Sequence, residues 1–266
     1  MIVVNKRKGE TPLQVIKEIR NKDKNLNFLP MTYAGRLDPL AEGVLIILIG
    51  DEVYNKDEYL KLKKEYEVEI LFGFATDTYD ILGKVNRILE LSDFSWSGTD
   101  PVPLVRGPEK FDNSRIRTIL KNFTGYFDQK YPPYSSRTVS GKPLFLWARE
   151  GKLSEIEIPS HRVYVDSIEI INEKSYLGSE LLSKIKNDIS LVKGDFRQEE
   201  ILKIWEEVLG NFPKENFQAI TLRVSCGSGV YMRSLANDLG EIIGAPSLAL
   251  NIKRTKIGDF NICSNL

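Results

Sequence analysis

The chain has 266 residues, of which 37 are basic and 37 acidic, so its formal net charge is zero. A hydrophobic content of 42% and a charged content of 28% are typical of a soluble globular protein with one large domain or two small ones. The longest apolar run is far shorter than a membrane span, which excludes a helical membrane protein. Zero net charge does not indicate nucleic-acid binding, which would depend on a local basic patch.

Three further absences narrow the function class. The N-terminus has no basic-then-apolar order and no small-residue cleavage site, so we expect no signal peptide. Cys226 and Cys263 have no metal-type spacing and indicate a reducing compartment, for which we expect the cytoplasm. His161 is the single histidine, which argues against a histidine triad or a histidine-rich metal site.

The first predicted elements are a short strand at residues 2–4 and a helix that begins after Thr11. Thr11 can cap this helix, Pro12 suits its first position, and Gln14 completes a capping box. The face that we expect to pack in the core carries Leu13, Ile16 and Ile19.

Residues 33–49 (YAGRLDPLAEGVLIILI) place a carboxylate just before a long apolar run. The run over residues 44–49 suits a strand buried on both faces. Pro39 lacks an N–H and fixes its own φ, so the backbone after Asp38 cannot continue a ladder. We therefore expect Asp38 on a stiff loop at the entrance to a core strand, which is the support that a functional carboxylate needs. An ordinary Asp-Pro turn is the alternative, and the dipeptide alone favours it.

Residues 65–72 (EYEVEILF) alternate between acidic and mainly apolar side chains, which predicts a strand with one wet face. Tyr66 begins the apolar face, with its hydroxyl at the rim. A polar, turn-rich loop follows at residues 73–83, and its threonines and aspartates raise the question of a calcium site. Their spacing does not fit an EF-hand, so we predict no metal there.

We expect a long surface loop at residues 92–110, which are rich in Ser, Gly and Pro. A helix is then predicted to begin at Asn113 or Ser114 and to end at Gly125. Its apolar stripe comprises Ile116, Ile119, Leu120 and Phe123.

Residues 129–151 (QKYPPYSSRTVSGKPLFLWAREG) are predicted to be irregular, with aromatic and basic side chains interleaved. Rings can stack on unstacked bases and cations can contact phosphates, so this composition suits a single-stranded RNA surface. A proline-rich loop anchored by aromatic residues explains the same composition, and both interpretations stay open at this point. The candidate RNA-contacting cations are Arg137, Lys142 and Arg149.

The second half of the chain predicts two more strands, at residues 162–171 and 218–226. Residues 172–194 show no clear pattern. A helix is expected from Asp195 to Gly210, which Asp195 and Gln198 could begin with a capping box.

A last helix is expected over residues 231–243, with Leu235, Leu239 and Ile242 facing inward. Arg233 falls in its first turn, where a cation opposes the helix dipole. Its presence there calls for a partner, which a buried carboxylate would supply.

Alternating strands with intervening helices predict a mixed α/β or α+β domain around a largely antiparallel sheet. The sequence has no dinucleotide-binding glycine motif, no Walker A motif, no nucleophile elbow and no zinc-protease helix motif. The usual cofactor and hydrolase routes are therefore unsupported.

Five blocks of the chain, taken in order, resemble TruB-type tRNA pseudouridine synthases. The catalytic block of that family, GTLDPLATGVL, is matched here by GRLDPLAEGVL, and its K-x-Y strand and TDT-x-D-x-x-G loop by KKEYEVEILFGFATDTYDILGKV. Its PP-x-YSA segment is matched by YPPYSSRTVSGKPLFLWAREG, and its SKGTYIR and R-R-T blocks by VSCGSGVYMRSLANDLGEIIGAPSLALNIKRTKIGDF. The stretch VNKRKGETPLQVIKEIR resembles the family's opening helix, KP-x-G-x-TS. Five blocks in the family's order are a specific signal.

The resemblance implies a pseudouridine synthase fold, which is α+β with a mixed, mostly antiparallel central sheet flanked by helices. It also implies isomerisation of uridine to pseudouridine in RNA, in which the glycosidic bond is broken and the base rejoined through carbon, without a cofactor or a metal. By motif position, Asp38 matches the essential catalytic aspartate, Arg233 the arginine that pairs with it, and Tyr66 the tyrosine that stacks on the target base. The pairing would keep Asp38 ionised in a water-poor pocket.

Further positions match substrate contacts of the family. Tyr231 and Ile252 match pocket positions, and residues 113–151 match the thumb-like segment that grips the RNA loop. Two positions depart from the family pattern. Tyr33 stands in place of a histidine that the family links to base flipping, and Arg36 replaces a small residue, so we assign both to substrate binding through altered contacts.

On this basis we expect a single catalytic domain over residues 1–266, with residues 172–216 as an insertion longer than the family's connector. We expect the RNA-binding domain appended in many relatives to be missing. The predicted partner is the T-stem-loop of tRNA, in which uridine 55 is the target. We expect the protein to be a monomer that neither associates with a membrane nor binds a metal. The alternatives are a ribosomal-RNA pseudouridine synthase, which the GRLD sequence suggests, and a tRNA-binding or tRNA-folding protein without turnover.

Overall fold

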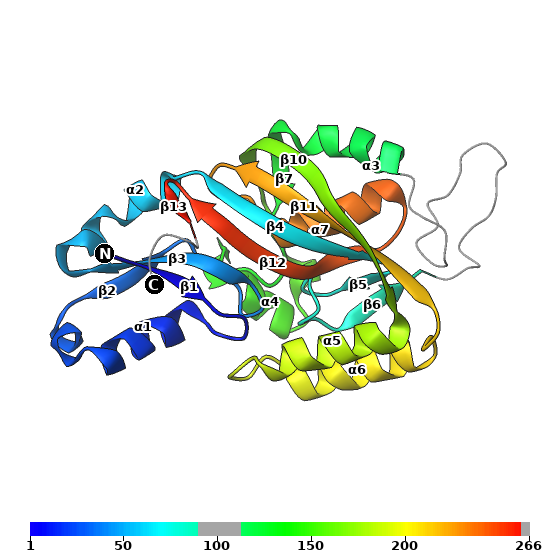
Figure 1. Ribbon diagram of the computed structural model, residues 1–266, viewed down its shortest axis with the longest axis horizontal. Helices are drawn as coiled ribbons and strands as arrows, with labels where there is room; N and C mark the ends of the chain where they lie inside the picture. Colours follow the sequence, from blue (N-terminus) through cyan, green and yellow to red (C-terminus); the bar gives the residue numbers. More distant parts are fainter. Residues whose placement is uncertain (90–112, 262–266) are drawn as a thin grey trace.

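The computed structural model describes residues 1–89 and 113–261 of the chain (Figure 1). The strands of its main sheet are β1 (Ile2–Lys6), β2 (Met31–Ala34), β3 (Glu42–Ile49), β4 (Lys64–Phe72), β7 (Gly125–Lys130), β10 (Ser160–Leu177), β11 (Asn216–Cys226), β12 (Ser247–Ile257) and β13 (Phe260–Asn261). Within the described residues they follow the order β1-β3-β12-β4-β11-β10-β7, with β2 beside β3 and β13 beside β12. β3 and β12 pair in parallel, and the other pairings among these strands are antiparallel. The predicted α+β class with a mostly antiparallel sheet is confirmed.

The helices are α1 (Pro12–Lys22), α2 (Lys56–Lys61), α3 (Asn113–Leu120), α4 (Leu144–Arg149), α5 (Gly178–Ser190), α6 (Gln198–Gly210) and α7 (Met232–Ile243). Two short hairpins join β5 (Phe74–Thr76) to β6 (Val85–Ile88) and β8 (Thr138–Val139) to β9 (Lys142–Pro143). Short 3₁₀ turns lie at Lys24–Phe28, Gly50–Asn55, Lys121–Phe123 and Leu153–Glu155. No helix in the described ranges is long and apolar enough to cross a membrane.

One face of the central strands packs against α7. Val68, Ile70 and Phe72 of β4 are fully buried and share a cluster with Leu235 and Leu239 of α7. Full burial of side chains of this size stabilises the fold by roughly 1.5–3 kcal/mol each. The apolar stripe predicted for one helix belongs to the same cluster through Ile116, Ile119, Leu120 and Phe123. The helix ends earlier than predicted, because α3 stops at Leu120 and Phe123 lies in the 3₁₀ turn that follows. These contacts fix α7 along the sheet and therefore fix the direction of its first turn.

The α5–α6 hairpin packs in a second cluster, beneath the sheet in Figure 1. Leu71 of β4, whose side chain points away from the α7 face, lies in this cluster with Leu181 of α5 and Trp205 of α6. Trp205 is fully buried, and its ring meets that of Phe74 edge-on with 5.4 Å between centroids. The hairpin is therefore part of the hydrophobic core.

β3 is buried on both faces, as its apolar run predicted. Val44, Ile46 and Leu48 pack in one cluster, while Leu45 and Ile47 pack against α1 in another. All five side chains are at most 1% exposed. The loop that precedes β3 therefore enters a strand that neighbouring layers hold on both sides.

The start of α1 agrees with the sequence analysis, except at one side chain. The Oγ1 of Thr11 accepts from the backbone N of Gln14, and the Oε1 of Gln14 accepts from the backbone N of Thr11, which completes the capping box. Ile16 is buried, as expected. The prediction for Leu13 was wrong, because this side chain is 66% exposed and lies at the edge of a cavity.

Residues 160–210 contain more regular structure than the sequence analysis assigned. β10 runs to Leu177, well beyond the predicted end, and α5 occupies a part in which no pattern was recognised. α6 begins at Gln198 and not at Asp195, because Arg197 has a left-handed backbone with φ at 64°. The side chain of Gln198 folds back instead, accepting from the backbone N of Phe196 at 2.8 Å.

Two other expectations need correction. Residues 129–151 are less irregular than predicted, since they contain the end of β7, the β8–β9 hairpin and α4. In α7, Ile242 is 47% exposed, and Ile243 takes the inward position that was assigned to it. The predicted surface loop at residues 92–110 lies outside the described residues.

Candidate active site

A buried lysine forms hydrogen bonds to the backbone of the loop that carries Asp38. Lys6 of β1 is fully buried, and its Nζ donates to the carbonyl oxygens of Pro39 at 3.2 Å and Ala41 at 2.5 Å. Burial lowers the pKa of Lys6 to about 8, against the raising effect of nearby carboxylates. The backbone on the C-terminal side of Asp38 is therefore fixed by a side chain of the neighbouring strand.

Arg254 of β12 holds both ends of the same loop. Its side chain is 1% exposed, its Nη2 donates to the carbonyl oxygen of Gly35 at 3.0 Å, and its Nε donates to that of Val44 at 2.8 Å. The backbone of Arg254 also lies against Gly43, where a Cβ would come within 2.1 Å of the Arg254 carbonyl oxygen. Glycine at this position, with φ at 111°, permits the close approach of β3 and β12.

Asp38 forms an ion pair with Arg233. The Nε of Arg233 donates to the Oδ2 of Asp38 at 2.8 Å, while its Nη1 donates to the carbonyl oxygen of Thr78 at 2.8 Å and its Nη2 to that of Tyr134 at 3.2 Å. The Arg233 side chain is 4% exposed and that of Asp38 is 33% exposed. The cation in the first turn of α7 thus has the carboxylate partner that the dipole argument called for, and that carboxylate still faces solvent.

The first turn of α7 is itself anchored to β7. Tyr231, the residue before the helix, donates its backbone N–H to the Oε1 of Gln129 at 2.8 Å and accepts from the Nε2 of Gln129 at 3.1 Å. Gln129 is fully buried. This two-point contact fixes the backbone from which Arg233 projects.

Tyr66 lies at the start of β4, next to Arg254 in the register of β4 and β12. Burial raises the pKa of the Tyr66 hydroxyl, and the Arg254 guanidinium acts against that rise. The ring packs against the α7-side cluster and lines the cavity that Asp38 faces. Its hydroxyl is therefore neutral at physiological pH and can serve as a hydrogen-bond donor.

A cavity of about 600 Å³ opens in front of the Asp38–Arg233 pair. A volume of this size is typical of pockets that bind small molecules or single nucleotides. Most of the residues that the sequence analysis selected line it: Tyr33, Arg36, Asp38, Tyr66, Arg149, Tyr231, Arg233 and Ile252.

Arg137 and Lys142 are not among the described residues that line the cavity. The guanidinium of Arg137 lies over the ring of Tyr131 at 5.3 Å. The Nζ of Lys142 lies 3.7 Å from the ring centroid of Trp147 and pairs with Glu150 at 2.6 Å. Both cations are thus engaged on the thumb-like segment, and their assignment to substrate binding stays a prediction.

Tyr33 and Arg36, which depart from the family pattern, lie together. The Nη2 of Arg36 donates to the hydroxyl of Tyr33 at 3.0 Å, and the Nζ of Lys56 lies 5.5 Å from the Tyr33 ring centroid. Arg36 is exposed. An aromatic ring with one cation at its hydroxyl and another over its ring suits contact with an RNA base and its phosphates.

Comparison with known proteins decides the family. A family model described as TruB family pseudouridylate synthase (N terminal domain) matches residues 24–196. The chain belongs to this family. The resemblance inferred from the sequence blocks is therefore confirmed.

Relatives of this TruB-family chain carry the name tRNA pseudouridine synthase B. That of Lactobacillus acidophilus is 29% identical over 98% of this chain and 69% of the relative, and that of Syntrophus aciditrophicus is 29% identical over 98% and 63%. That of Ligilactobacillus salivarius is 30% identical over 86% of this chain and 59% of the relative. The chain thus spans 59% to 69% of the length of these three relatives.

A likeness to solved structures supports the fold of the TruB-family chain. The structure titled "Crystal Structure of a Cbf5-Nop10-Gar1 Complex" contains a chain that superposes with a TM-score of 0.54 and 18% identity. The match covers 97% of this chain and 49% of that one. Within the described residues, no group of three or more His, Cys, Asp or Glu side chains could hold a metal ion.

Asp80 is a second carboxylate at this TruB-family site, and the sequence patterns did not single it out. Its Oδ2 lies 3.7 Å from the Nε of Arg233, and its Oδ1 accepts from the Oγ1 of Thr78 at 2.6 Å and the backbone N of Leu82 at 3.0 Å. Burial raises the pKa of Asp80 to about 6, although the charge of Arg233 and the bond from Thr78 act in the opposite direction. The available signal was the match to the TDT-x-D loop, which carried no role for this residue.

Arg233 is shared between the two carboxylates. Burial acts to lower the pKa of its guanidinium, but the charges of Asp38 and Asp80 outweigh that effect and raise the pKa. Arg233 is therefore a permanent cation at the base of the cavity. It can hold Asp38 in one orientation and stabilise its ionised form.

The loop between α5 and α6 was also missed. Asp195, Phe196 and Arg197 line the same cavity as Asp38. The backbone oxygen of Asp195 accepts from Arg149 of α4 at 3.0 Å, which links this loop to the thumb-like segment. The sequence predicts the start of a helix at this loop, so these side chains were not expected at the site.

Proposed function

We propose that this chain is a tRNA pseudouridine synthase that converts uridine to pseudouridine, with Asp38 as its catalytic residue and uridine 55 of the T-loop as its target. The observation that carries the proposal is the Asp38–Arg233 ion pair at the base of the cavity in a chain of the TruB family. The name of the relatives, tRNA pseudouridine synthase B, supports tRNA as the substrate.

The reaction needs an ionised carboxylate beside the glycosidic carbon. Asp38 can attack the sugar or the base as a nucleophile, or it can draw a proton from the ribose. Arg233 engages the Oδ2 of Asp38, while the Asp38 side chain is 33% exposed and lines the cavity. The carboxylate is therefore held as an anion with a fixed direction and remains accessible to a bound nucleotide.

The cavity suits a nucleotide that has left its stack. A uridine within a folded RNA loop must be flipped out before a protein side chain can reach its glycosidic bond. Tyr66 offers a ring for the flipped base, and Ile252 offers an apolar contact beside it. Tyr33 and Arg36 lie at the same cavity and would contact the neighbouring nucleotides.

The experiment is incubation of the purified chain with an unmodified tRNA transcript, followed by chemical mapping of pseudouridine. We expect one modified position in the T-loop. Asp38→Asn should abolish the product and leave RNA binding within about twofold, because the variant keeps the shape of the side chain. Asp51→Asn changes an exposed carboxylate beyond the far end of β3 and should behave as the wild type.

Other outcomes would point elsewhere. Product formation by the purified Asp38→Asn variant would refute the assignment of Asp38. Pseudouridine mapped in ribosomal RNA, and not in tRNA, of cells with and without the gene would favour the ribosomal alternative that Arg36 suggests. Tight tRNA binding without product at any enzyme excess would favour a folding or binding role. We place the protein in the cytoplasm as a monomer. Size-exclusion chromatography with light scattering tests the oligomeric state.

A further inference from the structure

The α5–α6 hairpin contacts one side of the loop between β5 and β6 (residues 77–84). The Nη1 of Arg197 pairs with the Oδ2 of Asp77 at 2.7 Å, and its Nη2 donates to the Oδ1 at 3.3 Å. The Nε1 of Trp205 donates to the carbonyl oxygen of Ile81 at 3.1 Å. Lys84 pairs with Glu200 at 2.5 Å. The hairpin thus holds this loop at its start, its middle and its end.

The other side of the same loop holds Arg233. Thr78, the residue after Asp77, accepts from the Nη1 of Arg233 through its carbonyl oxygen. Asp80 supplies the second carboxylate beside that guanidinium. Any displacement of the loop would therefore move partners of the cation that orients Asp38.

Arg197 also contacts the second carbonyl acceptor of Arg233. Its guanidinium lies over the ring of Tyr134 at 4.5 Å from the centroid, and the carbonyl oxygen of Tyr134 accepts from the Nη2 of Arg233. The one side chain of Arg197 thus touches Tyr134 and the neighbour of Thr78. Tyr134 and Asp77 come from different parts of the chain, and the guanidinium of Arg197 contacts both.

The local geometry of Arg197 is costly, which suggests a functional reason. Its φ of 64° lies in the left-handed region, which a non-glycine residue occupies at a cost of order 1–3 kcal/mol. Its side chain is 20% exposed and that of Asp77 is 27% exposed, so the pair is largely shielded from water. A two-point contact of this kind fixes direction as well as distance.

We propose that Arg197 is a positioning residue for the reaction, which holds the Thr78 and Tyr134 carbonyl groups in place for Arg233 and so orients Asp38. The inference rests on the proposed function, because it concerns the same catalytic aspartate. It gives the α5–α6 hairpin, which lies in the segment that we expect to be an insertion, a role in the active site. Direct contact of Arg197 with the RNA is the competing explanation, since the residue lines the cavity.

The test compares variants in single-turnover pseudouridine formation on a tRNA transcript and in RNA binding. Arg197→Gln should lower the single-turnover rate at saturating enzyme by at least tenfold and leave the Kd for RNA within twofold. Arg197→Lys should restore part of the rate, because a lysine keeps the charge but not the two-point contact. Asp77→Asn combined with Arg197→Gln should be no slower than Arg197→Gln alone, since both changes break the same Arg197–Asp77 contact.

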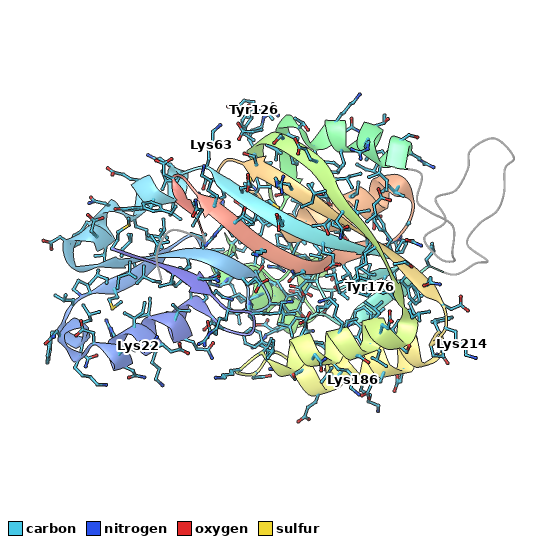
Figure 2. All side chains as sticks on the ribbon, in the orientation of Figure 1. Lys22, Lys63, Tyr126, Tyr176, Lys186 and Lys214 are labelled. Carbon is cyan, nitrogen blue, oxygen red and sulfur yellow. The ribbon has the colours of Figure 1, made fainter. Side chains whose placement is uncertain are left out.

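A matched control lies on the same hairpin. Lys186 of α5, labelled in Figure 2, pairs with Glu206 of α6 at 2.6 Å with both side chains about half exposed. Lys186→Gln should leave both the rate and the Kd unchanged. Thermal unfolding of all variants is measured in parallel, and the rate comparison uses temperatures at which each variant is folded.

A second measurement does not depend on turnover. In Arg197→Gln, the side-chain N–H protons of Arg233 should exchange with solvent faster than in the wild type, as observed by NMR. An unchanged exchange rate with an unchanged single-turnover rate would overturn the inference, and a weakened Kd with an unchanged rate would identify an RNA contact instead. A wild-type chain that forms no pseudouridine would refute the proposed function, whereas an active wild type with an equally active Arg197→Gln refutes this inference alone.

Discussion

Asp80 is a buried carboxylate whose ionisation opposes folding. Its pKa rises from 3.8 to about 6 because burial penalises the charged form. The folded state therefore takes up the proton more readily than the unfolded state between about pH 4 and pH 6. A group of this kind contributes stability that is fully present below its unfolded pKa and is lost as the pH rises through its folded pKa.

Asp80→Asn should remove this dependence. Its amide oxygen can still accept from Thr78 and Leu82, but the group no longer ionises. The free energy of unfolding of the wild type, relative to the variant, should fall by about 2 kcal/mol between pH 4 and pH 7, because an aspartate in the unfolded chain is already largely ionised at pH 4. Urea unfolding at pH 4, 5, 6 and 7 measures the difference, and a difference that stays constant over this range would contradict the assignment of the shift to Asp80.

The residues of the site differ in how far the sequence could predict them. Arg233 was conspicuous because a cation in the first turn of a helix needs a partner, but that argument did not say which carboxylate would supply it. The family motif selected Asp38, which lies 195 positions away in the chain. Asp80 and Arg197 could not be selected in this way, because their roles depend on contacts that only the folded loops bring together.

At the scale of the elements, Gly43 controls how closely β3 can approach β12. A Cβ on Gly43 would lie 2.1 Å from the carbonyl oxygen of Arg254, and this neighbour is backbone that cannot turn away. The β3–β12 pair is the parallel contact that joins the strand after the Asp38 loop to the strand that carries Arg254. Any change in their distance would therefore reach Asp38.

Gly43→Ala should lower the free energy of unfolding by at least about 3 kcal/mol, through a strained φ and a steric overlap with backbone. Gly50→Ala is the matched control, since Gly50 also has a positive φ, at 64°, but a Cβ there would meet nothing within 4 Å. We expect a loss of about 1 kcal/mol for the control. Chemical denaturation of both variants measures the difference, and equal losses would show that the overlap at Gly43 is relieved.

Strongly periodic elements were predictable, and elements whose apolar positions are diluted by polar residues were not. The alternation of β4 and the apolar run of β3 gave the correct strands and the correct buried faces. In α5, Leu181, Ile185 and Ile189 recur every four residues and are fully buried, so a helical signal was present. It was overlooked because lysine, serine and asparagine residues separate these positions, and because burial against the sheet is a tertiary property.

The whole molecule carries no net charge, so any RNA affinity must come from cations concentrated at the site. Arg36 and Arg149 line the cavity, and Arg36 is exposed beside Tyr33. An exposed guanidinium at the cavity is placed to contact a phosphate without any rearrangement of the core. Each such contact releases counterions from the RNA and therefore makes binding dependent on salt.

Arg36→Gln should weaken RNA binding several-fold at low salt and should reduce the slope of log Kd against log salt concentration by about one. The single-turnover rate at saturating enzyme should stay within about twofold, because Arg36 is not a partner of the Asp38–Arg233 pair. Arg223→Gln is the control. The Arg223 side chain is 45% exposed and pairs with Glu67, whose side chain points to the sheet face opposite Tyr66. Titration of a labelled T-stem-loop at several salt concentrations measures both slopes. If Arg223→Gln lowers the slope as much as Arg36→Gln does, the cations act through their overall charge, and the RNA is not held by a local patch at the cavity.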